Sequence, residues 1–146
     1  MDTTIGPIIL GIDTQAAPDR AWAFITEPDL VARWFAEASP LGDVGSPYRI
    51  DFGDGSVVEG RIVAVEPGRA FAHEWAWVDD AWDQPTLVRW QVEPALGGGS
   101  RINLVHEGWA EAGANDAMRD DHEAYWSGYL DDLRDLLNEA DTDASE

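Results

Sequence analysis

The chain has 146 residues, eight of them Trp and none of them Cys, and its formal net charge at pH 7 is −20. A surface this acidic repels phosphate backbones and anionic lipid headgroups, so we expect neither a nucleic acid nor a membrane as partner. Without Cys the chain forms no disulfide, and it shows no signal peptide and no membrane-spanning run, so we expect a cytoplasmic protein.

The first predicted elements are a strand and two short helices. Residues 8–14 are rich in β-branched side chains, which is typical of a strand. Pro18 suits the first turn of a helix, because proline has no N–H to lose there and its φ angle is already helical. Ala21 and Ile25 then recur at helical spacing, and Pro28 ends this helix and opens a second one. The sequence therefore predicts two helices in a V directly after the first strand.

Five more strands are predicted after the V. Apolar and polar residues alternate along them, as in strands that bury one face. Asp54-Gly55 is typical of the centre of a hairpin turn, and Gly97–Gly99 predicts the last hairpin. Strands joined by such short turns are antiparallel. The five predicted strands are residues 48–52, 57–66, 70–77, 86–93 and 101–107.

Residues 114–139 predict a long amphipathic helix, which would cover the apolar face of the sheet. We expect an α+β fold with a curved antiparallel sheet of about six strands, two short helices and this long C-terminal helix, leaving a cavity between helix and sheet. Residues 1–140 are predicted to form a single domain, and residues 141–146 an acidic, disordered tail. The apolar stripe of the helix consists of Met118, His122, Trp126, Tyr129, Leu130, Leu133, Leu136 and Leu137.

Several segments carry a likeness to a known family, namely residues 17–35, 58–69, 71–75, 97–109 and 125–133. In the order and spacing of these segments the chain resembles the START-like, pollen-allergen-like helix-grip superfamily (SRPBCC), and within it the homologues of the activator of heat-shock protein ATPase. The resemblance covers nearly the whole chain and implies the helix-grip fold. It leaves the activity open, because members include lipid and small-molecule carriers, polyketide aromatases and cyclases, toxin-sequestering proteins and chaperone activators.

Tyr125 departs from the pattern of this family. Members often have Gly just before the Trp of the last helix, whereas Tyr125 precedes Trp126 here. The departure predicts either a narrower cavity or a hydroxyl group that points into it.

All three His residues are predicted to face the interior between sheet and helix. His73 and His106 alternate with outward residues on their strands, and His122 lies on the apolar stripe of the helix. Because buried polar groups are usually hydrogen-bonded within the core, a structural role for His73 is the interpretation that we favour over ligand contact. Zinc needs three or four converging ligands, and the sequence has no His pair at a ligand spacing. We therefore expect no metal, and the resemblance implies none; we also expect no cofactor.

Aromatic side chains are the predicted walls of the cavity, because flat rings stack well on a flat apolar ligand. Trp82 and Trp109 fall in or beside loops, and Trp82 is a candidate for the cavity rim or for a partner contact. The predicted ligand-binding residues are Trp34, His73, Trp75, Trp90, His106, His122, Trp126 and Tyr129.

The sequence leaves three functions open. The first, which we favour, is the binding of a small hydrophobic ligand, aromatic or acyl, inside the cavity. The second is a chaperone-associated interaction module with a functional surface, as the resemblance suggests. The third is an enzyme of the aromatase or cyclase kind, in which His73 or His106 would be a general acid or base. No acid and base stand at a fixed spacing, so we assign no catalytic residue.

Overall fold

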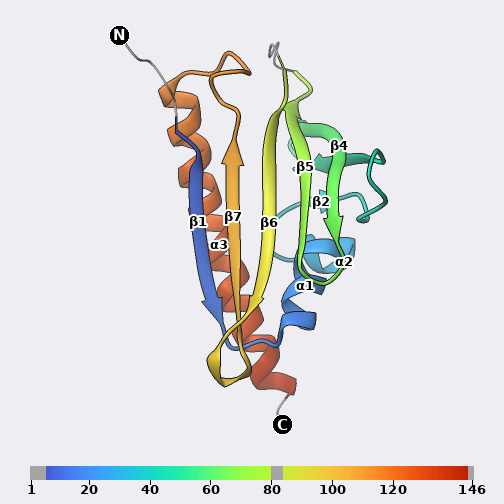
Figure 1. The fold of residues 1–146 in the computed structure, drawn as a ribbon, viewed down its shortest axis with the longest axis vertical. Coiled ribbons are helices and arrows are strands. Elements are labelled where there is room, and N and C mark those ends of the chain that lie inside the picture. The colour runs from blue at the N-terminus through green and yellow to red at the C-terminus, as the bar shows by residue number, and fades with distance from the viewer. Residues whose placement is uncertain (1–5, 80–83, 145–146) are drawn as a thin grey trace.

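The computed structural model of the chain describes residues 6–79 and 84–144 (Figure 1). Within them, seven strands form one antiparallel sheet in the order β1-β7-β6-β5-β4-β3-β2, and the long helix α3 runs along one face of it, behind β1 and β7 in Figure 1. None of the described helices has an apolar stretch long enough to cross a membrane. The elements are β1 (Ile8–Thr14), α1 (Pro18–Thr26), α2 (Pro28–Val31), β2 (Glu37–Ala38), β3 (Pro47–Asp51), β4 (Val57–Glu66), β5 (Ala70–Trp77), β6 (Thr86–Pro94), the short 3-10 turn η1 (Leu96–Gly98), β7 (Ser100–Glu107) and α3 (Asp116–Ala144).

The predicted α+β helix-grip fold is confirmed, with seven strands where the sequence predicts about six. The additional strand is β2, which has two residues and pairs with β3, placing Ala38 opposite Ile50. Two residues are too few for an alternation of apolar and polar side chains to be recognised, so the pattern gives no sign of this strand.

The predicted V of two helices is confirmed, and its proline residues explain it. Pro18 and Pro28 each occupy the first turn of a helix. The residues before them, Ala17 and Glu27, have extended backbones with ψ angles of 156° and 124°, as the steric clash with a following proline ring requires. The chain therefore changes direction at Glu27, between α1 and α2.

The strands turn their alternate residues inward, as predicted. In β6 the buried side chains are Thr86, Val88, Trp90 and Val92, and the residues between them are exposed or half-buried. The register places Phe71 of β5 opposite Trp90, and Trp90 opposite Leu104 of β7. Large aromatic and aliphatic side chains of neighbouring strands thus meet on the face that α3 covers.

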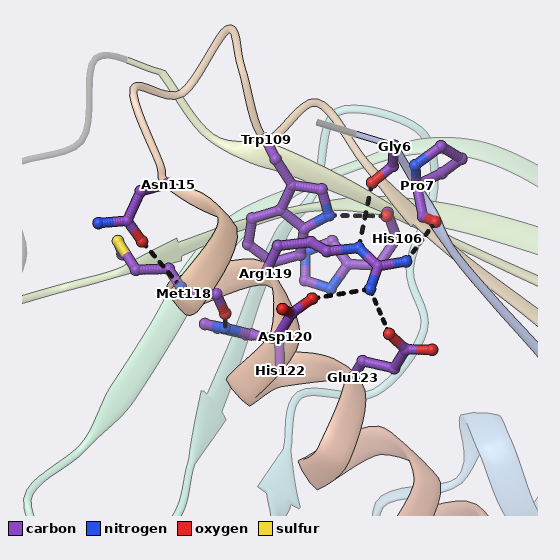
Figure 2. A network of polar contacts seen from close by, with 10 residues as sticks. All are labelled: Gly6, Pro7, His106, Trp109, Asn115, Met118, Arg119, Asp120, His122 and Glu123. Carbon is purple, nitrogen blue, oxygen red and sulfur yellow. Dashed lines mark hydrogen bonds and ion pairs between the residues drawn. The ribbon is translucent and has the colours of Figure 1, made fainter. Parts of the chain in front are cut away.

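Helix α3 begins at Asp116, where Asn115 provides the N-cap. The Asn115 Oδ1 accepts a hydrogen bond of 2.9 Å from the Met118 N–H, which would otherwise lack a partner within the helix (Figure 2). The helix continues to Ala144, so it includes residues 141–144 of the segment predicted to be a tail. Its buried side chains recur every three or four residues, as predicted for a covering helix: His122, Trp126, Leu130, Leu133 and Leu137.

Arg119 of α3 holds the chain that leads into β1. Its Nη2 donates to the Pro7 carbonyl at 2.9 Å and its Nε to the Gly6 carbonyl at 3.3 Å, while its Nη1 contacts the carboxylates of Asp120 and Glu123 (Figure 2). The guanidinium therefore joins the first strand of the sheet to the first turns of the last helix.

Candidate functional site

A cavity of about 310 Å³ lies between the sheet and α3. Its walls come from the segment after α2, the hairpin between β3 and β4, strand β5 and helix α3, so the site exists only when these separate elements pack together. Most of the lining is aromatic. The lining residues are Phe35, Phe52, Asp54, Ser56, Trp75, Trp77, His122, Tyr125, Trp126 and Tyr129.

Half of the predicted ligand-binding residues line this cavity. They are Trp75, His122, Trp126 and Tyr129. The other half are buried in the core beside it and do not line it: Trp34, His73, Trp90 and His106.

Phe35 contacts lining residues from the β3–β4 hairpin, β5 and α3. Its ring centroid lies 4.8 Å from that of Tyr129, 5.2 Å from that of Trp126 and 5.3 Å from that of Phe52. These distances are typical of edge-to-face and offset-stacked pairs, which add to the stability that burial alone provides. The prediction missed Phe35 and Phe52, although Phe52 alternates with the buried Ile50, and this spacing was a usable signal.

Trp77 and His122 form a direct bridge between β5 and α3 at the cavity wall. The Trp77 Nε1–H donates to the His122 Nε2 at 2.9 Å, and the His122 Nδ1 lies 2.7 Å from the Met118 carbonyl oxygen. Since Nε2 accepts a hydrogen bond, the ring hydrogen is on Nδ1, which donates to Met118. Trp77 is not among the predicted ligand-binding residues, although it follows Trp75 at the period of two that places residues on one face of a strand.

His106 is a core residue with both ring nitrogens occupied. Its Nδ1 accepts a 3.0 Å hydrogen bond from the Trp126 Nε1–H, and its Nε2 lies 2.7 Å from the Thr86 hydroxyl, which itself donates to the Trp75 carbonyl at 3.1 Å. The ring hydrogen is therefore on Nε2. Burial, followed by the nearby His122 and His73, lowers the pKa of His106 well below its ordinary value.

His73 is likewise buried in the core. Its side chain is 1% exposed, its Nδ1 donates to the Glu74 carbonyl at 3.1 Å, and its ring lies 4.5 Å from that of Tyr48. Burial lowers the pKa of His73 to about 4, so the ring is neutral near pH 7. Among the described residues, His, Asp and Glu side chains do not gather in any group of three that could hold a metal ion.

Trp34 and Trp90 pack in the core rather than around the cavity. The Trp34 Nε1–H donates to the Phe24 carbonyl at 2.8 Å, and the two indoles meet edge to face with centroids 6.0 Å apart. Trp109, which the sequence placed beside a loop, is fully buried: it donates to the His106 carbonyl at 3.0 Å and packs on the rings of His106 and His122. Trp82 lies outside the described residues.

Trp75, one of the lining residues, has an indole donor that is buried and has no partner. Its side chain is 2% exposed, and its Nε1 is the one buried side-chain polar atom in residues 6–79 and 84–138 that has no hydrogen-bond partner. An unpaired buried N–H costs about 1–3 kcal/mol, so such groups are rare in folded proteins and call for an explanation.

Tyr125 stands at the rim of the cavity instead of filling it. It is 66% exposed, although it is among the lining residues. Together with the exposed Asp54, its side chain borders the entrance of the cavity; the narrower cavity and the inward hydroxyl group remain predictions.

A second hollow, of about 380 Å³, adjoins the cavity and shares Ser56, Trp77, His122 and Tyr125 with it. Its remaining lining includes Asp79 and Asp121. A third hollow, of about 390 Å³, has no lining residue from α3 and mixes Glu66, Arg89, Gln91 and Asn103 with apolar side chains. The aromatic cavity and the hollow beside it therefore form the candidate site.

The sequence profile of the family described as "Activator of Hsp90 ATPase homolog 1-like protein" matches residues 15–138, which is most of the chain. The chain belongs to this family. The match confirms the resemblance to the helix-grip superfamily and spans α1 to most of α3. No curated protein sequence matches the chain.

Solved structures of several other proteins share the fold of this chain. DynU16, a protein of the dynemicin biosynthetic locus, aligns with a TM-score of 0.80 and 21% identity, over 92% of this chain and 48% of that one, so this chain spans about half its length. MLL2253 from Mesorhizobium loti aligns with a TM-score of 0.80 and 20% identity, over 92% and 98% of the two chains. The Aha1 dimer from Colwellia psychrerythraea aligns with a TM-score of 0.75 and 22% identity, over 92% and 97%.

Proposed function

We propose that the protein binds a small, largely apolar ligand with an aromatic ring in the cavity between the sheet and α3. The observation that carries this proposal is the cavity itself, whose walls include six Phe, Trp and Tyr rings apart from the rim residue Tyr125. Aromatic walls of this kind favour a flat ligand, because burial of its faces releases water and adds ring stacking.

The volume limits the size of the ligand. The cavity of about 310 Å³ equals the liquid volume of about ten water molecules and lies at the lower end of the range for ligand pockets. A ligand with one or two fused rings fits this volume, whereas a long acyl chain would have to extend into the adjoining hollow.

The unpaired Nε1–H of Trp75 supports a ligand with a hydrogen-bond acceptor. The donor is buried in the structure, so a shift of the indole would have to bring it to the cavity surface, where a carbonyl, ether or hydroxyl oxygen of the ligand would accept from it. Such a bond would orient the ligand, while the rings around it would supply most of the affinity.

Titration with 2-naphthol, followed by the indole N–H signals of the protein in NMR spectra, tests the proposal. We expect saturable shifts of the Trp75 and Trp77 indole signals. Ser56→Phe, which places a ring in the lining, should weaken binding at least tenfold. Ser127→Phe, the same change at an exposed position of α3 outside the lining, should leave binding unchanged. Absence of saturable shifts, or equal binding by Ser56→Phe, would contradict the proposal.

The description of the family favours a second candidate, a module that acts on a chaperone. This candidate requires a functional surface rather than a cavity. Stimulation of the ATPase of an Hsp90-type chaperone by the protein, equally strong with Ser56→Phe, would support it over the first.

The enzyme alternative is less well supported. His73 and His106, the predicted acid or base, are not in the lining, and of the three His residues it is His122 that a ligand in the cavity would reach. In the structure both nitrogens of His122 already have partners, which leaves no free position for proton transfer.

A further inference from the structure

The charges around the candidate site are all of one sign. Asp54 lines the cavity, and Asp79 and Asp121 line the adjoining hollow. Among the described residues that line these two hollows there is no Arg, and the chain contains no Lys at all. The described lining of the site therefore has carboxylates at the entrance and no Arg or Lys that would neutralise an anion.

The interior adds a second attraction for positive charge. The faces of Trp, Tyr and Phe rings carry negative electrostatic potential, and a cage of such rings is well suited to an organic cation, most of all where water is excluded. Trp75 and Trp126 are almost fully buried, and the rings of Phe35 and Tyr129, which also line the cavity, have centroids 4.8 Å apart.

Asp54 is held as a carboxylate at the entrance. Its Oδ1 accepts a 2.9 Å hydrogen bond from the Ser56 N–H, and this bond lowers the pKa of the Asp54 carboxyl. The charge of Asp54 also acts on Tyr129 in the cavity wall. The pKa of Tyr129 is raised, mainly by burial and secondly by the negative charge of Asp54. The negative field therefore extends from the rim into the lining.

We propose that the ligand of this cavity is an aromatic organic cation, such as an N-alkylated heteroaromatic ring or an aryl ammonium ion. The inference rests on the proposed function and makes it narrower. The rings would hold the flat body, and Asp54 would lie beside the positive charge at the entrance. An anion of the same shape would meet the carboxylates and a net charge of −20.

Three probes of nearly identical shape separate charge from shape. N-methylquinolinium is a cation, 1-methylnaphthalene is its neutral carbon analogue, and 1-naphthoate is an anion of similar size. We expect N-methylquinolinium to bind at least tenfold more tightly than 1-methylnaphthalene, and 1-naphthoate to bind more weakly than both. Raising the salt concentration should weaken the binding of the cation but not that of the neutral probe.

Asp54→Asn keeps the size of the side chain and removes the charge, so it should reduce the preference for the cation at least threefold. Asp19→Asn removes the same charge from an exposed position on α1 outside the lining, and should leave the preference unchanged. If 1-methylnaphthalene binds as tightly as N-methylquinolinium, or 1-naphthoate binds most tightly, this inference is wrong while the proposed function stands. If none of the three probes and not even 2-naphthol binds, the proposed function itself fails.

Discussion

The indole N–H of Trp126 on α3 donates a hydrogen bond of 3.0 Å to Nδ1 of His106 on β7, and both side chains are buried. This bond ties the covering helix to the sheet through polar atoms, as the Trp77–His122 hydrogen bond does. Trp126 also lines the cavity, whereas His106 does not, so the bond supports the cavity wall from behind.

The contribution of the Trp126–His106 hydrogen bond to stability can be measured by comparison with Trp75, whose indole N–H has no hydrogen-bond partner. Trp126→Phe and Trp75→Phe remove similar volumes from side chains that are both 2% exposed, but only Trp126→Phe leaves the buried Nδ1 of His106 without its donor. We expect Trp126→Phe to lower the free energy of unfolding by about 1–3 kcal/mol more than Trp75→Phe does. Urea unfolding monitored by circular dichroism measures both; equal losses would mean that the bond contributes nothing.

His73 should make the protein less stable as the pH falls. Its pKa is about 4 in the folded protein and 6.5 when unperturbed, so between these values the unfolded chain binds a proton that the folded protein does not. The contribution of His73 to the free energy of unfolding is therefore fully present above pH 6.5, where the ring is neutral in both states. It is lost progressively as the pH falls toward 4, because only the unfolded chain takes up the proton. Between about pH 7 and pH 5 the loss is about 2 kcal/mol.

His73→Phe isolates this effect, because protonation of the many carboxylates relieves charge repulsion over the same pH range and acts in the opposite direction. Phe keeps a ring beside Tyr48 but cannot take up a proton. The free energy of unfolding of the wild-type protein, relative to that of His73→Phe, should fall by about 2 kcal/mol between pH 7 and pH 5. Parallel pH profiles of the two proteins would contradict the assignment.

Two glycines should respond in opposite directions to substitution by alanine. A Cβ on Gly60 in β4 would clash with the backbone carbonyl of Glu74 in β5, whereas a Cβ on Gly128 in α3 would meet no atom within 4 Å. We expect Gly60→Ala to destabilise the protein by about 1–3 kcal/mol. Gly128→Ala should stabilise it by about 0.5–1 kcal/mol, since alanine favours the helix. Thermal unfolding of the two variants checks both signs.

Replacing Arg119 should lower the stability of the protein more than replacing Arg134, although both are ion-paired residues of α3. Arg119 donates to the carbonyls of Gly6 and Pro7, whereas the ion-pair partners of Arg134, Asp131 and Asp135, lie on the same helix. Arg119→Gln should cost about 1–2 kcal/mol and Arg134→Gln less than about 0.5 kcal/mol. Hydrogen exchange should quicken at the start of β1 in the first variant only; equal exchange in both would show that Arg119 does not hold this segment.

The fold was predictable because its determinants are local. Pro18 and Pro28 place the helix starts, and the alternation through Val88, Trp90 and Val92 sets the face of a strand. The two-residue strand β2 is beyond such reasoning, because its pairing with β3 depends on where the neighbouring loop lies.

The cavity was predictable only in part, since a strand face does not reveal how deep each residue lies. His73 and Trp75 share one face of β5, yet Tyr48 covers His73 while Trp75 reaches the cavity. Phe35 lies beyond the end of α2, where helical spacing no longer indicates a direction. Trp109 follows β7 in a turn and is nevertheless fully buried, because His106 and His122 provide the surface on which it packs.

The packed indoles give this protein a built-in optical signal. The ring centroids of Trp75 and Trp126 lie 5.2 Å apart, those of Trp75 and Trp77 5.6 Å, and those of Trp90 and Trp126 5.6 Å, each pair at a steep interplanar angle. Transitions of chromophores this close couple to one another, so the near-ultraviolet circular dichroism of the protein reports the mutual orientation of these rings. The signal disappears when specific packing is lost, even where helices and strands persist. Loss of this packing can therefore be followed in unlabelled, wild-type protein.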